Sequence, residues 1–189
     1  MLSRKPEPVS EKLLIRKYVF EGRAIKVRVD TVRTADGRRS TREIVEHGEC
    51  IAVVPVDADD NILLVKQFRS PLGKPLLEIP AGGIDRGENS EAAVIREMQE
   101  ETGFKPGKVI RLCGFYLTPG TSTEYLHLYL ATDLTPSRLH AEDTAGIVLI
   151  PTPVSEIPDL IKSGAMQDGK SIAGLLYYLE YCRNGGTPA

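Results

Sequence analysis

Three glutamates lie close together in the segment 90–104 of this 189-residue chain. On a helix, Glu97 would precede Glu100 by three residues and Glu101 by four, so each pair would repel by about 0.2–0.5 kcal/mol without a cation. Carboxylates at this density suit a hard divalent cation, which binds through one or two carboxylates and the phosphates of a substrate. The alternative is an acidic helix face that contacts only solvent. The spacing alone is compatible with both, and the residues around the acids have to decide between them.

The residues around these acids predict a helix from Ser90 to Gly103. Asn89 and Ser90 are both good N-cap types, and Gly103 is typical of a helix C-terminus. If each residue turns by about 100°, the three glutamates lie opposite Ile95. The residues expected on the buried side with Ile95 are Ala92, Met98 and Thr102. We therefore expect one face of the helix to be buried and the acids to lie on the other.

A longer pattern surrounds the acids between residues 82 and 104. Its fixed positions read Gly82-x5-Glu88-x7-Arg96-Glu97-Met98-x-Glu100-Glu101-x-Gly103-Phe104. This string resembles the Nudix box, the signature of hydrolases that act on nucleoside diphosphates linked to another group, at every fixed position. The resemblance implies an α+β fold: an α/β/α sandwich with a mixed sheet, here with a small N-terminal antiparallel β-sheet.

The same resemblance implies roles for individual residues. Glu97 and Glu101 would bind the metal with help from Glu100, and the backbone carbonyl of Ala81 would be a further ligand. The ion would be Mg²⁺, with Mn²⁺ as the alternative. Glu88 and Arg96 match positions that pair to fix the loop on the helix. Metal ions suit this reaction because they neutralise the charge of a phosphoanhydride, orient it and lower the pKa of the attacking water.

The substrate is narrowed by segments outside the box. Glu78-Ile79-Pro80-Ala81-Gly82 and the segment 116–124 resemble the ADP-ribose pyrophosphatase subgroup, whose members cut ADP-ribose to AMP and ribose 5-phosphate. In the second segment Pro119 lies 16 residues after Gly103. The alternative for Pro119-Gly120 is an ordinary turn between strands. The residues that we expect to bind this small nucleotide-sugar substrate are Arg42, Glu43, Arg69, Glu78, Pro119, Gly120 and Glu124.

The arginines and glutamates among these residues are expected to bind different groups of the substrate. Guanidinium groups bind phosphate oxygens bidentately, which suits Arg42 and Arg69. Glu43 and Glu78 could accept hydrogen bonds from adenine or ribose. The segment 41–47 is similar to an N-terminal strand of the family that reaches the substrate in a swapped dimer, so the resemblance implies a homodimer.

A general base is still needed, and the resemblance places it in the acid-rich loop 140–144. Glu142 matches the base position, while Asp143 or the box acids Glu100 and Glu101 are alternatives. Thr144 departs from the family pattern, because a second acid that binds metal is frequent there. The number of metal ions therefore stays open.

Other activities share parts of this pattern. One alternative is a hydrolase of another nucleotide sugar, such as GDP-mannose. Another is a non-catalytic ADP-ribose sensor, although such sensors usually have a damaged box and an added DNA-binding domain. A third is an enzyme that removes oxidised nucleoside triphosphates, which the long strand-rich N-terminal region disfavours.

The composition agrees with a small-molecule enzyme. The net charge is −2, which suggests neither a nucleic-acid partner nor an anionic membrane, and no apolar run approaches the roughly 18 residues of a membrane span. The three cysteines are widely spaced, so we expect reduced thiols in a cytoplasmic protein. We expect residues 1–48 to form a tail and strands for dimerisation, and residues 49–189 to form the hydrolase domain.

The elements that must position these residues follow from periodicity and turn signals. Predicted helices cover 90–103, 154–163 and 168–183, and a polar loop covers 133–146. The strands 50–56 and 62–68 are expected to form a hairpin. The remaining predicted strands are 13–20, 24–32, 42–47, 109–117, 124–131 and 147–150.

Overall fold

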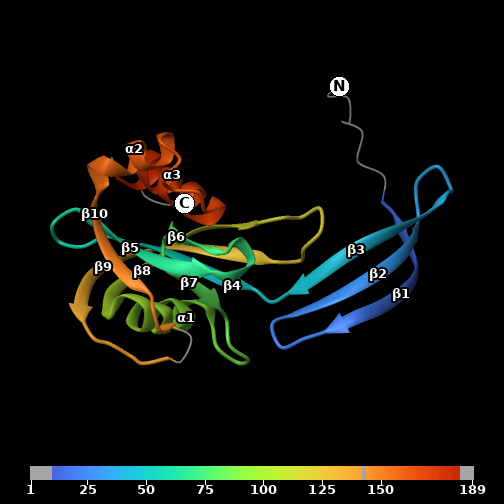
Figure 1. Ribbon diagram of the computed structural model, residues 1–189, viewed down its shortest axis with the longest axis horizontal. Coiled ribbons are helices and arrows are strands. Elements are labelled where there is room, and N and C mark those ends of the chain that lie inside the picture. Colours follow the sequence, from blue (N-terminus) through green and yellow to red (C-terminus); the bar gives the residue numbers. More distant parts are fainter. Residues whose placement is uncertain (1–9, 142–143, 184–189) are drawn as a thin grey trace, which may run out of the picture. The chain divides into compact units, whose positions relative to one another are not determined.

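The computed structural model describes residues 10–141 and 144–183 (Figure 1). The chain divides into two compact units. The N-terminal unit takes in the chain up to Gly48 together with Thr118–Glu124, and the core unit takes in Glu49–Leu117 and the chain from Tyr125 onward. No helix in the described ranges is long and apolar enough to cross a lipid bilayer.

The N-terminal unit is a three-stranded antiparallel sheet in the order β1-β2-β3. Its strands are β1 (Lys12–Glu21), β2 (Ile25–Arg33) and β3 (Arg39–His47). The segment Thr118–Glu124 attaches to β3, because the Val45 N–H donates to the Thr121 carbonyl at 2.8 Å and the Thr123 N–H donates to the Val45 carbonyl at 3.0 Å. The predicted small N-terminal antiparallel sheet is therefore confirmed.

The core unit contains two sheets. The first has the order β7-β4-β9-β8, with β4 parallel to β9 and its other pairs antiparallel, so the expected mixed sheet is confirmed. The second has the antiparallel order β10-β5-β6. The strands are β4 (Cys50–Pro55), β5 (Asn61–Arg69), β6 (Lys74–Glu78), β7 (Ala81–Gly83), β8 (Phe104–Tyr116), β9 (Tyr125–Pro136) and β10 (Val148–Pro153).

Strand β4 lies at the centre of the core unit, and all six of its residues are buried. A strand that is covered on both faces needs apolar side chains on both, which explains its continuous run of apolar residues. Ile51 and Val53 pack into a cluster with Val94, whereas Ala52 and Val54 pack into a second cluster. That second cluster includes Leu175.

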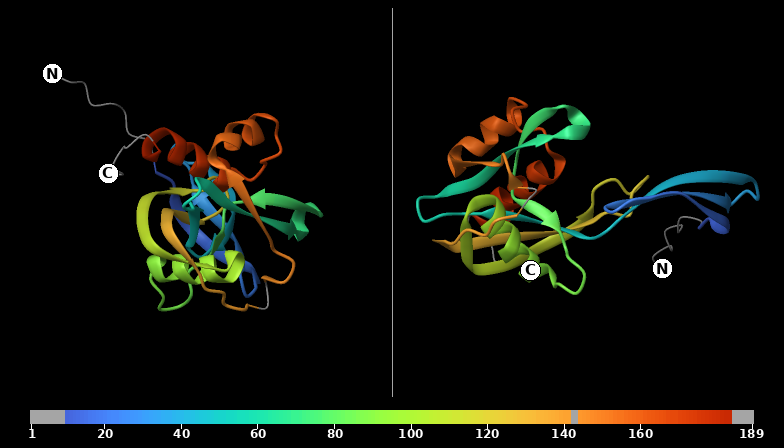
Figure 2. Two further views of the ribbon diagram at one scale, coloured as in Figure 1. Left: turned by 90° about the vertical axis from the view of Figure 1, so that its left-hand side faces the viewer. Right: turned by 60° about the horizontal axis from the view of Figure 1, so that its bottom comes forward.

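Helices cover both faces of this sheet (Figures 1 and 2). Helix α1 (Ser90–Glu97) lies on one face and continues as a π-helical turn, Met98–Thr102. Helices α2 (Ile157–Lys162) and α3 (Gly169–Tyr177) lie on the other, and α3 also continues as a π-helical turn, Tyr178–Cys182. The predicted α/β/α sandwich is confirmed.

Several elements differ from the expectation. Strands β4 and β5 do not form a regular hairpin, because they belong to different sheets and share only an isolated bridge between Val56 and Ile62. Strand β9 runs on to Pro136 and so takes up the start of the predicted loop 133–146. Strands β6 and β7 were not expected, because such short strands in a Gly- and Pro-rich stretch have no readable period. These two strands form because they pair with β5 and β4 of the core unit.

Candidate active site

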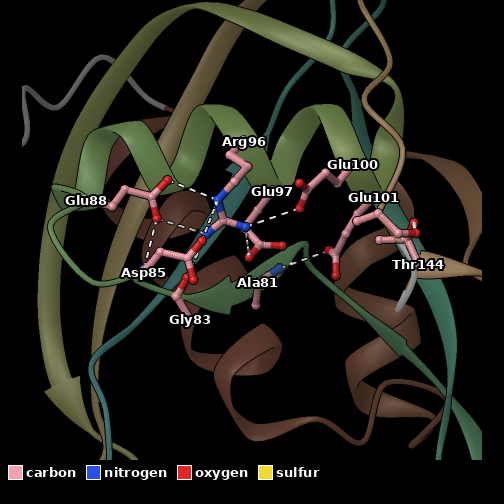
Figure 3. A network of polar contacts seen from close by, with 10 residues as sticks. Ala81, Gly83, Asp85, Glu88, Arg96, Glu97, Glu100, Glu101 and Thr144 are labelled. Atoms are coloured by element: carbon pink, nitrogen blue, oxygen red, sulfur yellow. Dashed lines mark hydrogen bonds and ion pairs between the residues drawn. The ribbon is translucent and has the colours of Figure 1, made fainter. Parts of the chain in front are cut away.

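Glu97 and Glu101 are both buried, which corrects the expectation that the acids lie opposite the buried face. The buried residues of the helix are Ala93, Val94, Glu97, Met98, Glu101 and Thr102. Ala92, which was expected on the buried side, is exposed. The helix is covered on one side by the apolar cluster of Ile51 and Val53. On another side its acids lie against the strand β7 (Figure 3).

The expected buried face was centred on Ile95, which is only half-buried, whereas the observed face is centred on Val94, from which Glu101 lies about 20° away on a wheel of 100° per residue. The helix is α-helical only as far as Glu97, and Glu100 and Glu101 belong to the wider turn. Such π-helical turns occur frequently at functional sites. The turn ends at Gly103, whose φ of 80° is in the left-handed region that glycine adopts without strain. The predicted C-terminal stop is confirmed.

Arg96 is the centre of the polar contacts in Figure 3. Its Nε and Nη2 donate to the two oxygens of Glu88, each at 3.0 Å, so the predicted pairing of Arg96 with Glu88 is confirmed. Nη1 donates to Glu97 at 2.7 Å and to Glu100 at 3.2 Å. Nη2 also donates to the Gly83 carbonyl at 2.8 Å. One guanidinium thus ties the helix to the loop before it and to β7.

This network also supplies a cation at helical spacing from the acids. Arg96 lies four residues before Glu100 and relieves part of the repulsion among the acids. Glu101 differs from its neighbours. Within residues 10–141 and 144–183, no Lys, Arg or His side chain forms an ion pair with it, and its Oε2 accepts the Ala81 N–H at 3.1 Å. Glu101 is therefore an acid of the box without a cationic partner among these residues.

Gly82 leaves room for the Glu97 carboxylate. A Cβ built on Gly82 would overlap with the carboxylate carbon and both oxygens of Glu97. Any other residue at this position would push Glu97 off the backbone of β7. The glycine of the box therefore makes room for the Glu97 carboxylate.

Electrostatics also supports a cation at this place. Burial, and then repulsion from Glu97, raise the pKa of Glu101 from 4.5 to about 8, although the Ala81 N–H and the charges of Lys170 and Arg69 oppose the rise. A carboxyl group with so high a pKa is stabilised by any divalent ion that replaces its proton. The donor set is carboxylate oxygen from Glu97 and Glu101, with Glu100 next to them, and this is the chemistry that hard divalent ions prefer. The residues present therefore fit a divalent metal.

Arg69 and Glu78, two predicted substrate-binding residues, pair with each other. Arg69 Nε donates to Glu78 Oε1 and Nη2 donates to Oε2, both at 2.6 Å. Glu78 is buried, with 1% of its surface exposed, and its Oε2 also contacts Lys170 Nζ. Burial alone would raise the pKa of Glu78, but Arg69 and Lys170 hold it below its usual value.

Lys170 was not anticipated from the sequence. Its Nζ contacts Glu78 and lies 2.9 Å from Asp168 Oδ2. The signal in the sequence is weak: a lysine in the first turn of a helix is unfavourable beside the positive end of the helix dipole, so it needs a carboxylate partner. Only the fold shows that one partner is Glu78, 92 residues earlier.

The residues between Glu78 and Ala81 are held at both ends. The Ile79 N–H donates to Ser171 Oγ at 2.8 Å, and Asp168 caps α3 by accepting the Ser171 N–H at 3.0 Å. The Ala81 N–H reaches Glu101 at the other end. The prediction that the Ala81 carbonyl binds metal stays a prediction, but the structure does place this peptide beside an acid of the box.

The other predicted substrate residues lie in the N-terminal unit. Arg42 and Glu43 are neighbours on β3, where Arg42 Nη1 donates to Ser40 Oγ at 2.9 Å and its Nη2 pairs with Glu11. Pro119, Gly120 and Glu124 belong to the segment that attaches to β3. The structure thus gathers these five residues around one strand.

The predicted base, Glu142, lies outside the described residues, as does the alternative, Asp143. The residues on either side of this pair are described, and Thr144 Oγ1 donates to the Ala141 carbonyl at 2.9 Å. In Figure 3 Thr144 lies beyond Glu101 at the end of the π-helical turn. Its hydroxyl stands where the family pattern frequently has an acid.

Comparison with known proteins agrees with this geometry. Residues 46–173 match the model of the NUDIX domain, and residues 11–45 match that of the nucleoside diphosphate sugar hydrolase N-terminal domain. The ADP-ribose pyrophosphatase of Bacillus subtilis (strain 168) is 32% identical over 171 residues, which cover 89% of this chain and 92% of that protein.

Two further relatives extend the comparison. The GDP-mannose pyrophosphatase of Enterobacter sp. (strain 638) is 30% identical over 190 residues, which cover 95% of this chain and 97% of that protein. A solved structure of an ADP compounds hydrolase superposes with a TM-score of 0.85 at 21% identity and covers 93% of this chain and 96% of its own, so it shows the shared fold. With an intact box, buried acids and a family match over most of its length, the chain belongs to the Nudix hydrolase family, whose members need a divalent metal ion.

Proposed function

We propose that this protein hydrolyses the diphosphate bond of ADP-ribose to AMP and ribose 5-phosphate with Mg²⁺ as its cofactor. The observation that carries the proposal is Glu101, a carboxylate with 7% of its surface exposed that has no cationic partner among the described residues and lies beside Glu97. The similarity to the Bacillus subtilis ADP-ribose pyrophosphatase over nearly the whole chain supports the choice of substrate.

Each acid has a part in the proposed reaction. Glu97 and Glu101 would hold the ion from the helix side, Glu100 would assist, and the Ala81 carbonyl would complete the protein ligands. When bound, the ion supplies charge neutralisation at the diphosphate and a lower pKa for the attacking water. Glu142 would accept the proton of that water, and Arg69 would bind the phosphate oxygens. Arg96 keeps Glu97 in place by its hydrogen bond at 2.7 Å.

A homodimer completes the proposal. Strand β1 exposes Leu13, Ile15, Val19 and Phe20, and Ile15 has 57% of its surface exposed. Large apolar side chains on an outer strand favour pairing with a second copy. In such a dimer Arg42 and Glu43 would reach the substrate of the neighbouring subunit. The three free cysteines, Cys50, Cys113 and Cys182, suit a cytoplasmic location.

The main alternative substrate is GDP-mannose, because the Enterobacter relative is a GDP-mannose pyrophosphatase. The two nucleotide sugars share the diphosphate and differ in both the base and the sugar. We therefore expect a panel of ADP-ribose, GDP-mannose and an oxidised nucleoside triphosphate to give the highest kcat/KM for ADP-ribose. A higher value for GDP-mannose would replace the proposed substrate and leave the reaction type unchanged.

The metal role is tested by Glu101→Gln, which keeps the shape of the side chain and removes its charge. Loss of a direct ligand should cost on the order of 10³-fold in kcat, more than the 10–100-fold typical of residues that only support a ligand. Circular dichroism should show an unchanged fold. Turnover of ADP-ribose by this variant at the wild-type rate in Mg²⁺ would refute the role assigned to Glu101. Binding of ADP-ribose by the wild-type protein without hydrolysis would refute the proposed activity itself.

A further inference from the structure

Lys170 occupies an unusual place at the start of α3. Only 11% of its side chain is exposed, and its Nζ contacts Glu78 and lies 2.9 Å from Asp168. A buried lysine is costly unless carboxylates surround it. Here two carboxylates do so, one from its own helix terminus and one from the end of β6. The fold therefore keeps a cation at a position where neither the helix dipole nor burial favours it.

Arg69 is the second cation on Glu78. Two of its nitrogens form the bidentate pair with the carboxylate, at 2.6 Å each. Its Nη1 makes no hydrogen bond within the described part of the chain, and 37% of the side chain is exposed. One edge of the guanidinium is thus fixed by Glu78 while the rest is available to an anion.

The charges of this cluster balance only because Lys170 is there. Glu78 and Asp168 carry two negative charges, and Arg69 and Lys170 carry two positive charges. Without Lys170, Arg69 would be the only cation beside two carboxylates, so the cluster would be net negative. A net negative cluster repels a diphosphate even if the guanidinium keeps its position.

We propose that Lys170 is a positioning residue, which offsets the charge of Glu78 and so keeps the cluster around Arg69 from becoming net negative and the guanidinium oriented for the diphosphate of the substrate. This inference rests on the proposed function, since it assigns Arg69 to the phosphates of the same site. Lys170 itself touches no substrate atom in this account. It acts through Glu78, and Glu78 acts through its two hydrogen bonds to Arg69.

The proposal predicts an effect on KM that a general loss of stability would not cause. Lys170→Met should raise KM for ADP-ribose about tenfold, the change expected when one charge-assisted contact is lost, with kcat within about twofold. Lys170→Arg restores the positive charge, so its KM should be at least about threefold lower than the KM of Lys170→Met. Lys162→Met removes an exposed lysine of α2 and should leave both constants unchanged.

A double-mutant cycle with Arg69→Ala tests whether Lys170 acts through the arginine. If it does, Lys170→Met should change KM by less than about twofold in the Arg69→Ala background. If Lys170→Met proves unstable in thermal unfolding, Lys170→Gln carries the same cycle, because it keeps a hydrogen-bond donor for Glu78 and removes only the charge.

Two results would overturn the inference. One is a folded Lys170→Met or Lys170→Gln protein with wild-type KM. The other is an equal rise in KM with and without Arg69. Both are measured against a wild-type protein that hydrolyses ADP-ribose, so they are distinct from failure of the proposed function, in which the wild type itself would not turn over. Binding of inorganic diphosphate in Mg²⁺, followed by calorimetry, gives the same comparison without turnover and should weaken about tenfold in Lys170→Met.

Discussion

The Glu97 carboxylate lies against the backbone of Gly82, where a side chain on the glycine would overlap with it. This contact links the first fixed position of the Nudix box to one of the acids proposed to bind the metal. Arg96 holds the same carboxylate from the other side at 2.7 Å. The position of Glu97 thus depends on the absence of a side chain at Gly82 on one side and on the hydrogen bond from Arg96 on the other.

Gly82→Ala should therefore act on the metal site. The added methyl group displaces the Glu97 carboxylate, and a shift of about 1 Å in a catalytic group can cost on the order of 10²-fold in rate. We expect kcat/KM to fall by about that factor. Raising the Mg²⁺ concentration should restore part of the activity.

Gly83→Ala is the matched control, because a Cβ there would meet nothing within 4 Å. Its carbonyl, which accepts a hydrogen bond from Arg96, is unchanged by the substitution. Equal losses in the two variants would show that the loop tolerates no alanine at all, and that the overlap with Glu97 does not explain the effect.

Metal-free protein should lose stability as the pH rises between about 4.5 and 8. The pKa of Glu101 is raised from 4.5 to about 8 by burial first and by Glu97 second. The folded state then holds a proton that the unfolded state releases, so the stabilisation is complete below pH 4.5 and is lost as the pH rises through 8. Melting temperatures measured in EDTA across this range should show the decline.

Glu101→Gln removes this titration and leaves the other acids unchanged, so the difference between the two melting curves isolates Glu101. We expect the variant to be more stable than the wild type at pH 8 and above in EDTA, with no advantage at low pH. Mg²⁺ should also bind the wild type more tightly as the pH rises toward 8, because the ion replaces the proton. A constant difference at every pH would contradict this account.

Arg96→Ala should destabilise the protein more when the metal is removed. Arg96 bonds to Glu88, Glu97, Glu100 and the Gly83 carbonyl, and hydrogen bonds to charged groups contribute about 1.5–3 kcal/mol each when their partners are left unsatisfied. We expect urea unfolding in EDTA to show a loss of about 2–3 kcal/mol, since the side chain is partly exposed. Mg²⁺ should then stabilise the variant more than the wild type, because it is the remaining cation near the acids.

A useful control for Arg96→Ala is Arg111→Ala. Arg111 is an exposed residue of β8, and among the described residues its Nη2 contacts the ring of half-buried His127 at 3.3 Å. We expect a change within about 0.5 kcal/mol and no dependence on Mg²⁺. An equal effect of Mg²⁺ on both variants would argue against the role of Arg96 in balancing the acids.

Ile15→Asp should convert a dimer into a monomer. An aspartate in the centre of β1 places a charge on the apolar surface that the proposed dimer buries. Sedimentation velocity should give a dimer for the wild type and a monomer for the variant, and the variant should lose activity because Arg42 and Glu43 no longer reach the neighbouring subunit. Leu139→Asp, at an exposed apolar residue of the core unit, should remain dimeric. A fully active wild-type monomer would refute the dimer.

Local signals predicted part of this structure well. Asn89 accepts the Ala92 N–H as the N-cap of α1, and Gly103 ends the π-helical turn in a left-handed conformation. Both features depend on residues within a few positions of each other. The pairing of Glu88 with Arg96 was implied by the resemblance to the Nudix box, whose residues also lie close together in the sequence.

Features that depend on distant pairing could not be predicted in this way. Lys170 meets Glu78 only because α3 packs beside the end of β6, and no spacing in the sequence indicates that contact. The buried face of α1 is another case, since the sequence does not show that β4 and β7 cover the side of Val94 and Glu101 and leave Ile95 half-buried. Strand β7 has three residues, too few for a period, and is ordered by its pairing with β4.

The short stretch from Glu78 to Ala81 connects the two proposed ligand sites. At one end its carboxylate orients the arginine assigned to the phosphates, and at the other its amide contacts an acid of the box. Four consecutive residues are too few to flex independently when both ends are held. If both ends bind their ligands as proposed, any change that the nucleotide makes in the affinity for the ion must equal the change that the ion makes in the affinity for the nucleotide.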